Sequence, residues 1–591
     1  MPKRGAKRRI VFFLGVLLVA PIARCAQSPS GSAASPGAGG AFAEGAAAFQ
    51  RGDLGAARAS FEDAIHLNPQ DVESRNALGL VLLAQNDATG AVRQFEEALR
   101  VAPDFLGARL NLSSALLRAD DFEGAAREAR AAVDLAPDDP DAHLALARAL
   151  GATSRVPEAV RSLRRAVELA PGRSDLHDGL GTLLVQENDI ASASSEFEEA
   201  LRLNPGLASA HLHLGVLEFE QRRLDQAEVH LRRSSQLDGA NFLTWNYLGR
   251  TLREEGKPAD AADAFRASLK IHADQPDVLA LLGEALGRAG NPVEAAAVFR
   301  ELLRTDPQNS DTQNNLGLAL LESGDGDGAI AAFEAALKIR PTDTGYRGNL
   351  GAAYLQKADF GRAASEFRAA LERDPKNQSL HYNLGLALKL QDKLPEAVEE
   401  LKVAEAINPS QPDAPYTLGV TLWQMGKGPE AVTELQNAVR AKPDYAEAFY
   451  LLGTVLKQLG QLPESAEALR QAVRLQPDFA GAHTTLAAVL RQLGDNQGAA
   501  AEAKLGAQLA KQTTDMQAAV FATNSGRRLR GMGDLDGAVS QFRAAIHAVA
   551  DYAPAHFELA IALRQMGKKE DAAAEFEKAA RLDPKLVAPQ P

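Results

Sequence analysis

The sequence is short of cysteine and of aromatic side chains. Cys25 is the only cysteine among 591 residues, and aromatic residues make up 5% of the chain. A single cysteine near the amino terminus excludes an intramolecular disulfide and leaves the rest of the chain without a thiolate nucleophile or ligand. With 46% hydrophobic residues but few large ones, the composition favours thin layers of closely packed helices over a thick globular core.

Long hydrophobic runs are also absent, except near the amino terminus. Residues 1–9 are strongly basic, residues 10–23 are almost entirely apolar, and a polar stretch of small residues begins at Gln27. This order is typical of a secretory signal. Fourteen helical residues span about 21 Å, short of a hydrocarbon core of roughly 30 Å, so for residues 1–26 a cleaved signal peptide is favoured over the alternative, a membrane anchor.

We therefore expect an extracytoplasmic, bacterial protein that is periplasmic, envelope-associated or secreted. Its membrane contact would be limited to the amino-terminal segment, if that segment is retained or lipidated. The run Ile22-Ala23-Arg24-Cys25 resembles a bacterial lipoprotein signal, which makes Cys25 a candidate lipidation site. Arg24 departs from that signal, because the site needs a small residue before the cysteine. Residues 27–37 are expected to be a flexible linker.

The charge balance and the missing motifs exclude several function classes. The formal net charge is −13, and the first 26 residues hold six basic residues and no acid, so the remainder is more acidic still. Nucleic acid is therefore a poor partner. The chain has no glycine-rich phosphate loop, Gly-x-Ser-x-Gly turn, His-Glu-x-x-His or Cys-x-x-Cys motif. We predict no enzymatic activity, no catalytic or metal-ligating residue and no cofactor.

The sequence has instead a 34-residue period. The period runs from residue 38 to residue 513 and again from 519 to 586, which gives fourteen repeats followed by two. Position 20 is alanine in fifteen repeats, position 24 is Phe in nine and Leu in five, and position 32 is proline in twelve. Position 8 is Ala or Ser in four repeats and glycine in the others, at Gly45, Gly79, Gly181, Gly215, Gly249, Gly283, Gly317, Gly351, Gly385, Gly419, Gly453 and Gly526.

These residue types predict two helices in each repeat. A glycine inside a helix costs about 1 kcal/mol, which close approach of a second helix justifies. We expect positions 8 and 20 to face each other, and the bulky residue at position 24 to fill the space between successive helix pairs. Proline at position 32 ends the second helix.

The pattern resembles the tetratricopeptide-repeat family. Residues 245–249, WNYLG, followed by Ala261 and Phe265, show it best, and the resemblance extends over residues 38–586. It implies an all-α fold, a right-handed superhelical solenoid of antiparallel helix pairs. The first helices would line a concave groove.

One junction is irregular. The repeat that ends near Lys511 lacks the proline and is followed by five extra residues, 514–518. We expect a joint there, where the array bends or a helix runs on. A short tail, residues 587–591, follows the last repeat.

Two sets of polar residues recur on the first helices. Histidine occupies position 4 in six repeats, but adjacent first helices lie on the order of 10 Å apart and zinc binds nitrogen at about 2 Å, so a structural role is expected. Asparagine at position 6 is a candidate peptide-binding set, because an amide both donates and accepts hydrogen bonds. The resemblance supports this, since glycosyltransferase members of the family bind an extended peptide with an asparagine ladder. The candidates are Asn315, Asn349 and Asn383 in consecutive repeats, with Asn111 and Asn524 apart from them.

The alternative for these asparagines is a purely structural role, because most side-chain hydrogen bonds go to local backbone or water. Our leading hypothesis is a scaffold that binds a protein or an extended peptide in the groove. The alternative is an accessory subunit for envelope polysaccharide export, secretion or pilus biogenesis. The sequence identifies neither the partner nor the oligomeric state.

Overall fold

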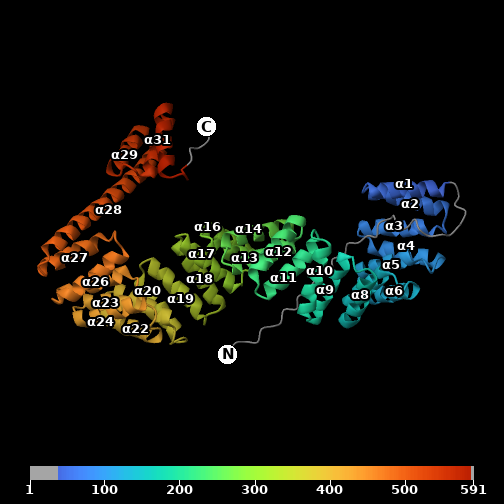
Figure 1. Cartoon of the computed structure of the whole chain (residues 1–591), viewed down its shortest axis with the longest axis horizontal. Helices are drawn as coiled ribbons and strands as arrows, with labels where there is room; N and C mark the ends of the chain where they lie inside the picture. Colours follow the sequence, from blue (N-terminus) through green and yellow to red (C-terminus); the bar gives the residue numbers. More distant parts are fainter. Residues whose placement is uncertain (1–36, 587–591) are drawn as a thin grey trace. The chain divides into compact units, whose positions relative to one another are not determined.

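The computed structural model describes residues 37–586 (Figure 1). The proposed signal peptide with Cys25, nearly all of the linker and the tail 587–591 lie outside this range. Within it the chain forms 31 helices and no strand. None of these helices combines the length and apolar character that a membrane crossing requires. The chain divides into two compact units between Pro307 and Gln308, and each is described by itself.

The first compact unit contains sixteen helices. They are α1 (Ala38–Gln50), α2 (Leu54–Leu67), α3 (Val72–Ala84), α4 (Ala88–Val101), α5 (Leu106–Arg118), α6 (Phe122–Leu135), α7 (Pro140–Ala152), α8 (Val156–Leu169), α9 (Ser174–Glu187), α10 (Ile190–Leu203), α11 (Ala208–Glu220), α12 (Leu224–Leu237), α13 (Phe242–Glu254), α14 (Pro258–Ile271), α15 (Pro276–Arg288) and α16 (Pro292–Thr305).

The second compact unit contains the remaining helices, of which α28 is much longer than the others. They are α17 (Ser310–Glu322), α18 (Gly326–Ile339), α19 (Thr344–Gln356), α20 (Phe360–Leu371), α21 (Gln378–Leu390), α22 (Leu394–Ile407), α23 (Asp413–Gln424), α24 (Gly428–Ala441), α25 (Ala446–Gln458), α26 (Leu462–Leu475), α27 (Ala480–Gln492), α28 (Asn496–Gly531), α29 (Leu535–Ala548), α30 (Ala553–Gln565) and α31 (Lys569–Leu582).

Each repeat is a pair of helices joined by a tight turn. Position 15, in the turn, has a positive φ in seven non-glycine and nine glycine residues, sixteen in all, one for each repeat. The next residue often caps the second helix; Asp325, for example, accepts a hydrogen bond from the backbone N–H of Gly328 at 2.9 Å. The prediction of an all-α solenoid of antiparallel helix pairs is confirmed.

The contact between positions 8 and 24 adds to the expectation for position 24. A Cβ added to Gly317 would lie 2.5 Å from Cε1 of Phe333, so the phenyl ring packs directly on the glycine of its own repeat. Position 24 therefore packs first inside its own helix pair, and it also reaches the next pair: the ring of Phe197 lies 5.6 Å from that of His213 on α11, between centroids. The small residue at position 8 is required because the ring takes the volume that a side chain would need.

In ten repeats the side chain at position 4 joins the first helix to the turn before it. His381 shows the geometry: Nε2 donates to the backbone carbonyl of Pro375 at 3.1 Å, and Nδ1 lies 2.6 Å from the carboxylate of Glu400, at position 23 of the same repeat. Arg, His or Trp makes the same bond to the carbonyl six residues earlier at Arg75, Arg109, His143, His177, His211, Trp245, Arg347, His483 and His556. The position-4 histidines are therefore part of the packing between repeats.

The irregular junction forms one continuous helix. α28 runs from Asn496 to Gly531, through the extra residues 514–518, and provides both the second helix of one repeat and the first helix of the next. Figure 1 shows it as an unbroken helix between α27 and α29. No proline interrupts it, so nothing in the local sequence ends the helix at the usual place.

Candidate functional site

The consecutive asparagines lie on three successive first helices of the second compact unit. Asn315 is on α17, Asn349 on α19 and Asn383 on α21, and all three are half-buried. Asn111 lies on α5 in the first compact unit, and Asn524 is exposed on α28, where its Oδ1 lies 3.4 Å from Nη1 of Arg527. The structure therefore places three of the five candidates in one row and leaves the other two apart.

Where both residues are asparagine, the side chain at position 6 donates a hydrogen bond to the side chain at position 5 of the preceding first helix. Asn349 donates from Nδ2 to Oδ1 of Asn314 at 2.8 Å. In the first compact unit, Asn111 donates in the same way to the buried Asn76 at 2.9 Å. These two amides are partly satisfied within the protein, which gives them a structural role beside any binding role.

Asn383 differs from the other asparagines. Among residues 37–586, its side chain has no hydrogen-bond partner, although it is half-buried. The residue at position 5 of the preceding repeat is Gly348, which offers no side-chain acceptor. Asn383 is therefore the asparagine of this row whose donors and acceptor are all available to a ligand.

A row of tyrosines continues from the asparagines, and sequence reasoning missed it. Position 5 is tyrosine in three consecutive repeats, at Tyr382 on α21, Tyr416 on α23 and Tyr450 on α25. All three rings are half-buried, and within the described residues their hydroxyls have no hydrogen-bond partner. The same search by position that found asparagine at position 6 would have found tyrosine at position 5.

The tyrosines pack against further aromatic side chains. The rings of Tyr416 and Tyr445 have centroids 4.9 Å apart, and those of Tyr450 and Phe479 are 4.8 Å apart. Burial and the nearby carboxylate of Glu447 raise the pKa of Tyr416. Burial also raises the pKa of Tyr445, so these hydroxyls stay protonated and keep their donors at neutral pH. We call Asn315, Asn349, Asn383, Tyr382, Tyr416 and Tyr450 the Asn–Tyr surface.

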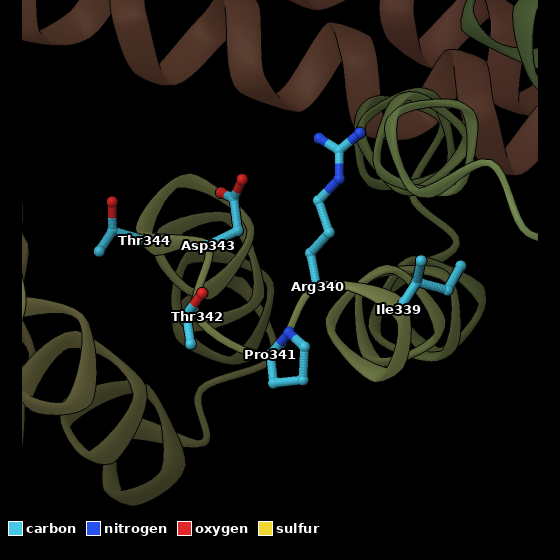
Figure 2. A pocket seen from close by; sticks show the side chains of 6 residues that line it. All are labelled: Ile339, Arg340, Pro341, Thr342, Asp343 and Thr344. Atoms are coloured by element: carbon cyan, nitrogen blue, oxygen red, sulfur yellow. The ribbon is translucent and has the colours of Figure 1, made fainter.

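The turn between α18 and α19 lines a surface hollow of about 540 Å³. Figure 2 shows its six side chains, from Ile339 to Thr344, spreading apart and not converging on one point. Arg340 pairs with Asp311 at 2.9 Å, and Asp343 accepts a hydrogen bond from the backbone N–H of Tyr346. Because these charged groups already have partners, the hollow is a poor candidate for a ligand site.

A serine, a histidine and an aspartate meet on α9 and α11. Asp178 lies 2.7 Å from Nδ1 of His213 through one carboxylate oxygen and accepts from the hydroxyl of Ser209 at 2.7 Å through the other. In a catalytic triad the histidine must contact the serine hydroxyl in order to remove its proton. Here both residues contact the aspartate instead, so the arrangement does not activate Ser209.

Three titratable groups lie close together on α11 and α12. Nδ1 of His211 and Nδ1 of His230 are 3.0 Å apart, and Nε2 of His230 lies 3.9 Å from Glu218. Burial lowers the pKa of both histidines and raises that of Glu218 to about 7. No group of three or more His, Cys, Asp or Glu side chains within residues 37–586 has an arrangement that could hold a metal ion.

Solved structures with similar folds include three that share little sequence. A tetratricopeptide repeat protein from Parabacteroides merdae is 14% identical, with a TM-score of 0.37, over 43% of this chain and 100% of that protein. Yeast Tom70 is 17% identical, with a TM-score of 0.31, over 71% of this chain and 96% of the Tom70 chain. The MamA protein is 23% identical, with a TM-score of 0.28, over 29% of this chain and 93% of the MamA chain.

No curated protein matches the chain. A family model described as tetratricopeptide repeat matches ten segments, at residues 42–105, 76–140, 110–174, 179–241, 246–310, 280–344, 349–412, 416–478, 450–512 and 523–586. These segments span most of the helical array, and their overlaps follow the 34-residue period. The chain therefore belongs to the tetratricopeptide repeat family.

Proposed function

We propose that this protein is a non-catalytic scaffold whose Asn–Tyr surface binds an extended polypeptide. The observation that carries the proposal is the side chain of Asn383, which is half-buried and without an internal partner beside Tyr382. Because this amide is partly exposed and bonded to no other side chain among the described residues, a ligand's backbone can take the place of water on it without breaking an internal hydrogen bond.

The chemistry of the surface suits a polypeptide backbone. An asparagine amide donates to a backbone carbonyl and accepts from a backbone N–H without selecting a side chain. The neighbouring tyrosines offer apolar ring faces for the ligand's side chains and a hydroxyl for a further hydrogen bond. The surface would therefore favour an extended chain over a rigid folded domain.

The amino-terminal segment supports an extracytoplasmic setting for this binding. Residues 1–26 have the basic, apolar and polar order of a secretory signal, so we propose that the mature chain starts between Arg24 and Gln27. Mass spectrometry of the protein from its native cell tests this. An exported protein that retains residues 1–20 would contradict cleavage, and the same spectrum reports lipid on Cys25.

Site-specific photo-crosslinking tests the binding surface. Benzoylphenylalanine in place of Tyr416 should capture a polypeptide from the native extract, because the side chain lies within the proposed surface. The control places the same group at Ser365, which is exposed on the second helix α20. Capture at Tyr416 but not at Ser365 is the expected result, and equal capture at both positions would contradict the proposal.

A further inference from the structure

The third residue of each first helix lies at the contact with the preceding repeat. The hydroxyl oxygens of Ser234, at position 27 of one repeat, and Thr244, at position 3 of the next, are 3.2 Å apart and both residues are buried. Position 3 is buried in the same way at Ser74, Ala108, Ala142, Leu176, Ala210, Val278, Tyr346, Leu380, Ala414, Ala448, Ala482 and Ala555. A residue at position 3 is therefore normally covered by the second helix before it.

Phe521 breaks this rule. It occupies position 3 of the repeat that starts at Ala519, yet it is 76% exposed. In the first described repeat, the position-3 residue Gly40 is exposed as well. The repeat that starts at Ala519 thus presents an uncovered incoming face, and that face carries a large aromatic side chain.

The repeat before it presents an uncovered outgoing face. Its second helix is the amino-terminal half of α28, where Gly506 at position 27 is buried against Thr484 of α27 and Ala507 at position 28 is exposed. Alanine is the smallest residue at position 28 of any junction in the array. A small residue on this face leaves room for a large residue on the face that docks there.

α28 keeps the two faces of one chain apart. In a regular junction the turn at position 32 folds the next first helix back against the second helix, but here the helix runs straight on. Residues 507–518 span about 18 Å, nearly two helix diameters. Leu505, Met516 and Val520 along the same helix are each more than a third exposed.

We propose that a second copy of this chain covers both faces. The incoming face with Phe521 of one copy docks on the outgoing face with Ala507 of the other, and the reverse contact forms at the same time. The two faces are complementary because they are the two sides of the junction that the array repeats elsewhere. Each copy carries one of each, so the exchange closes as a two-fold symmetric dimer.

The oligomeric state of the full-length chain tests the exchange. Multi-angle light scattering should give twice the 62.7 kDa of one chain at micromolar concentration. Phe521→Asp should weaken dimerisation at least tenfold, because it places a charge where an apolar anchor docks. Val293→Asp is the matched control, since Val293 is 73% exposed on α16 in the first compact unit, and it should leave the dimer unchanged.

Crosslinking tests which faces meet. With Cys25→Ser to remove the only native thiol, the Ala507→Cys, Val520→Cys double variant, which keeps Phe521, should give a covalent dimer with a short bismaleimide. The two positions are thirteen residues apart on one helix, about 20 Å, so a short reagent does not join them within a chain. A monomer at every concentration, equal dimerisation of Phe521→Asp and wild type, or a dimer that the reagent fails to trap would each overturn the exchange.

Discussion

The imidazole of His381 and the carboxylate of Glu400 lie 2.6 Å apart, between the two helices of one repeat. The same pairing of positions 4 and 23 joins His177 to Glu196 at 2.6 Å and Arg347 to Glu366 at 3.0 Å. Where position 4 is not basic, position 23 is often apolar; Phe449 accompanies Ala468. Glu434 is the exception, because it is an acidic residue at position 23 although the position-4 residue of its repeat, Pro415, is not basic.

The first prediction concerns this exception. Burial, and secondarily the nearby Glu405, raise the pKa of Glu434 from its ordinary value of 4.5 to about 7. Because the pKa of this carboxyl is higher in the folded than in the unfolded state, the folded state becomes more stable as the pH falls from about 7 to 4.5. Above pH 7 the buried carboxyl is charged, and the full cost of burying that charge destabilises the fold. Glu434→Gln should therefore stabilise the fold at pH 8 and have little effect at pH 4.5, as measured by hydrogen exchange of α23 and α24.

The matched control is Glu366→Gln, at the same position two repeats earlier. It should destabilise the fold at pH 8, because the carboxylate that pairs with Arg347 at 3.0 Å is lost, by about 1–3 kcal/mol. Opposite signs for the two substitutions are the expected result. A destabilising Glu434→Gln at pH 8 would show that Glu434 is well paired and that the account of this position is wrong.

The second prediction concerns the glycine at position 8. Gly317→Ala should destabilise the fold by about 1–3 kcal/mol, because the new Cβ meets the ring of Phe333 and overpacks the contact. Gly287 is also helical but has no atom within 4 Å of the added Cβ, so Gly287→Ala should stabilise by about 0.5–1 kcal/mol. Hydrogen exchange of α17 and of α15 measures the two effects, and equal signs would refute the packing argument.

The third prediction concerns backbone strain at Ala358. Its φ is 59°, in the left-handed region that costs a residue with a Cβ about 1–2 kcal/mol. Ala358→Gly removes that cost but adds freedom to the unfolded chain, for a net gain of up to about 1 kcal/mol. Ala353→Gly, at a buried position inside α19, should be destabilising instead. Loss of hydrogen-exchange protection in the Ala358→Gly variant would contradict the strain proposed at Ala358.

Much of the fold could be predicted from the sequence because the same residue types recur at the same spacing. Proline at position 32 and the small residues at positions 8 and 20 were enough to place both helices of a repeat. The direction of a single ring was not predictable: Phe333 packs on Gly317 within its own repeat, which depends on the tilt of the two helices.

The irregular junction was open in the sequence between a bend and a continuous helix. The five extra residues 514–518 have no proline or glycine, and the structure continues α28 through them. Which faces this leaves uncovered depends on three-dimensional packing. The exposure of Phe521 therefore could not be predicted from its position in the repeat, since the other junctions within each compact unit bury that position.

The candidate site was predictable only in part. Asparagine at position 6 identified the row on α17, α19 and α21, but the pattern could not tell that Asn349 bonds Asn314 while Asn383 has no internal partner. The choice between a neighbouring side chain and a ligand depends on the residue at position 5 of the preceding helix. The five asparagines remain predictions as binding residues.

The measurement that tests the central claim most directly is calorimetry with the polypeptide captured at Tyr416. Asn383→Ala should weaken binding by about 0.5–1.5 kcal/mol, or about 2- to 13-fold, and leave helicity unchanged because no internal bond is lost. The joint replacement of Asn315, Asn349 and Asn383 by alanine should cost about 1.5–4.5 kcal/mol of binding free energy.

The matched control replaces Lys338, Ser365 and Glu399, exposed on the second helices of the same three repeats, and should keep the affinity within a few-fold. A large loss for the asparagine variant with no loss for this control is the result that the account predicts. Equal affinities of the wild type and the asparagine triple variant would contradict it and leave those residues with a structural role alone.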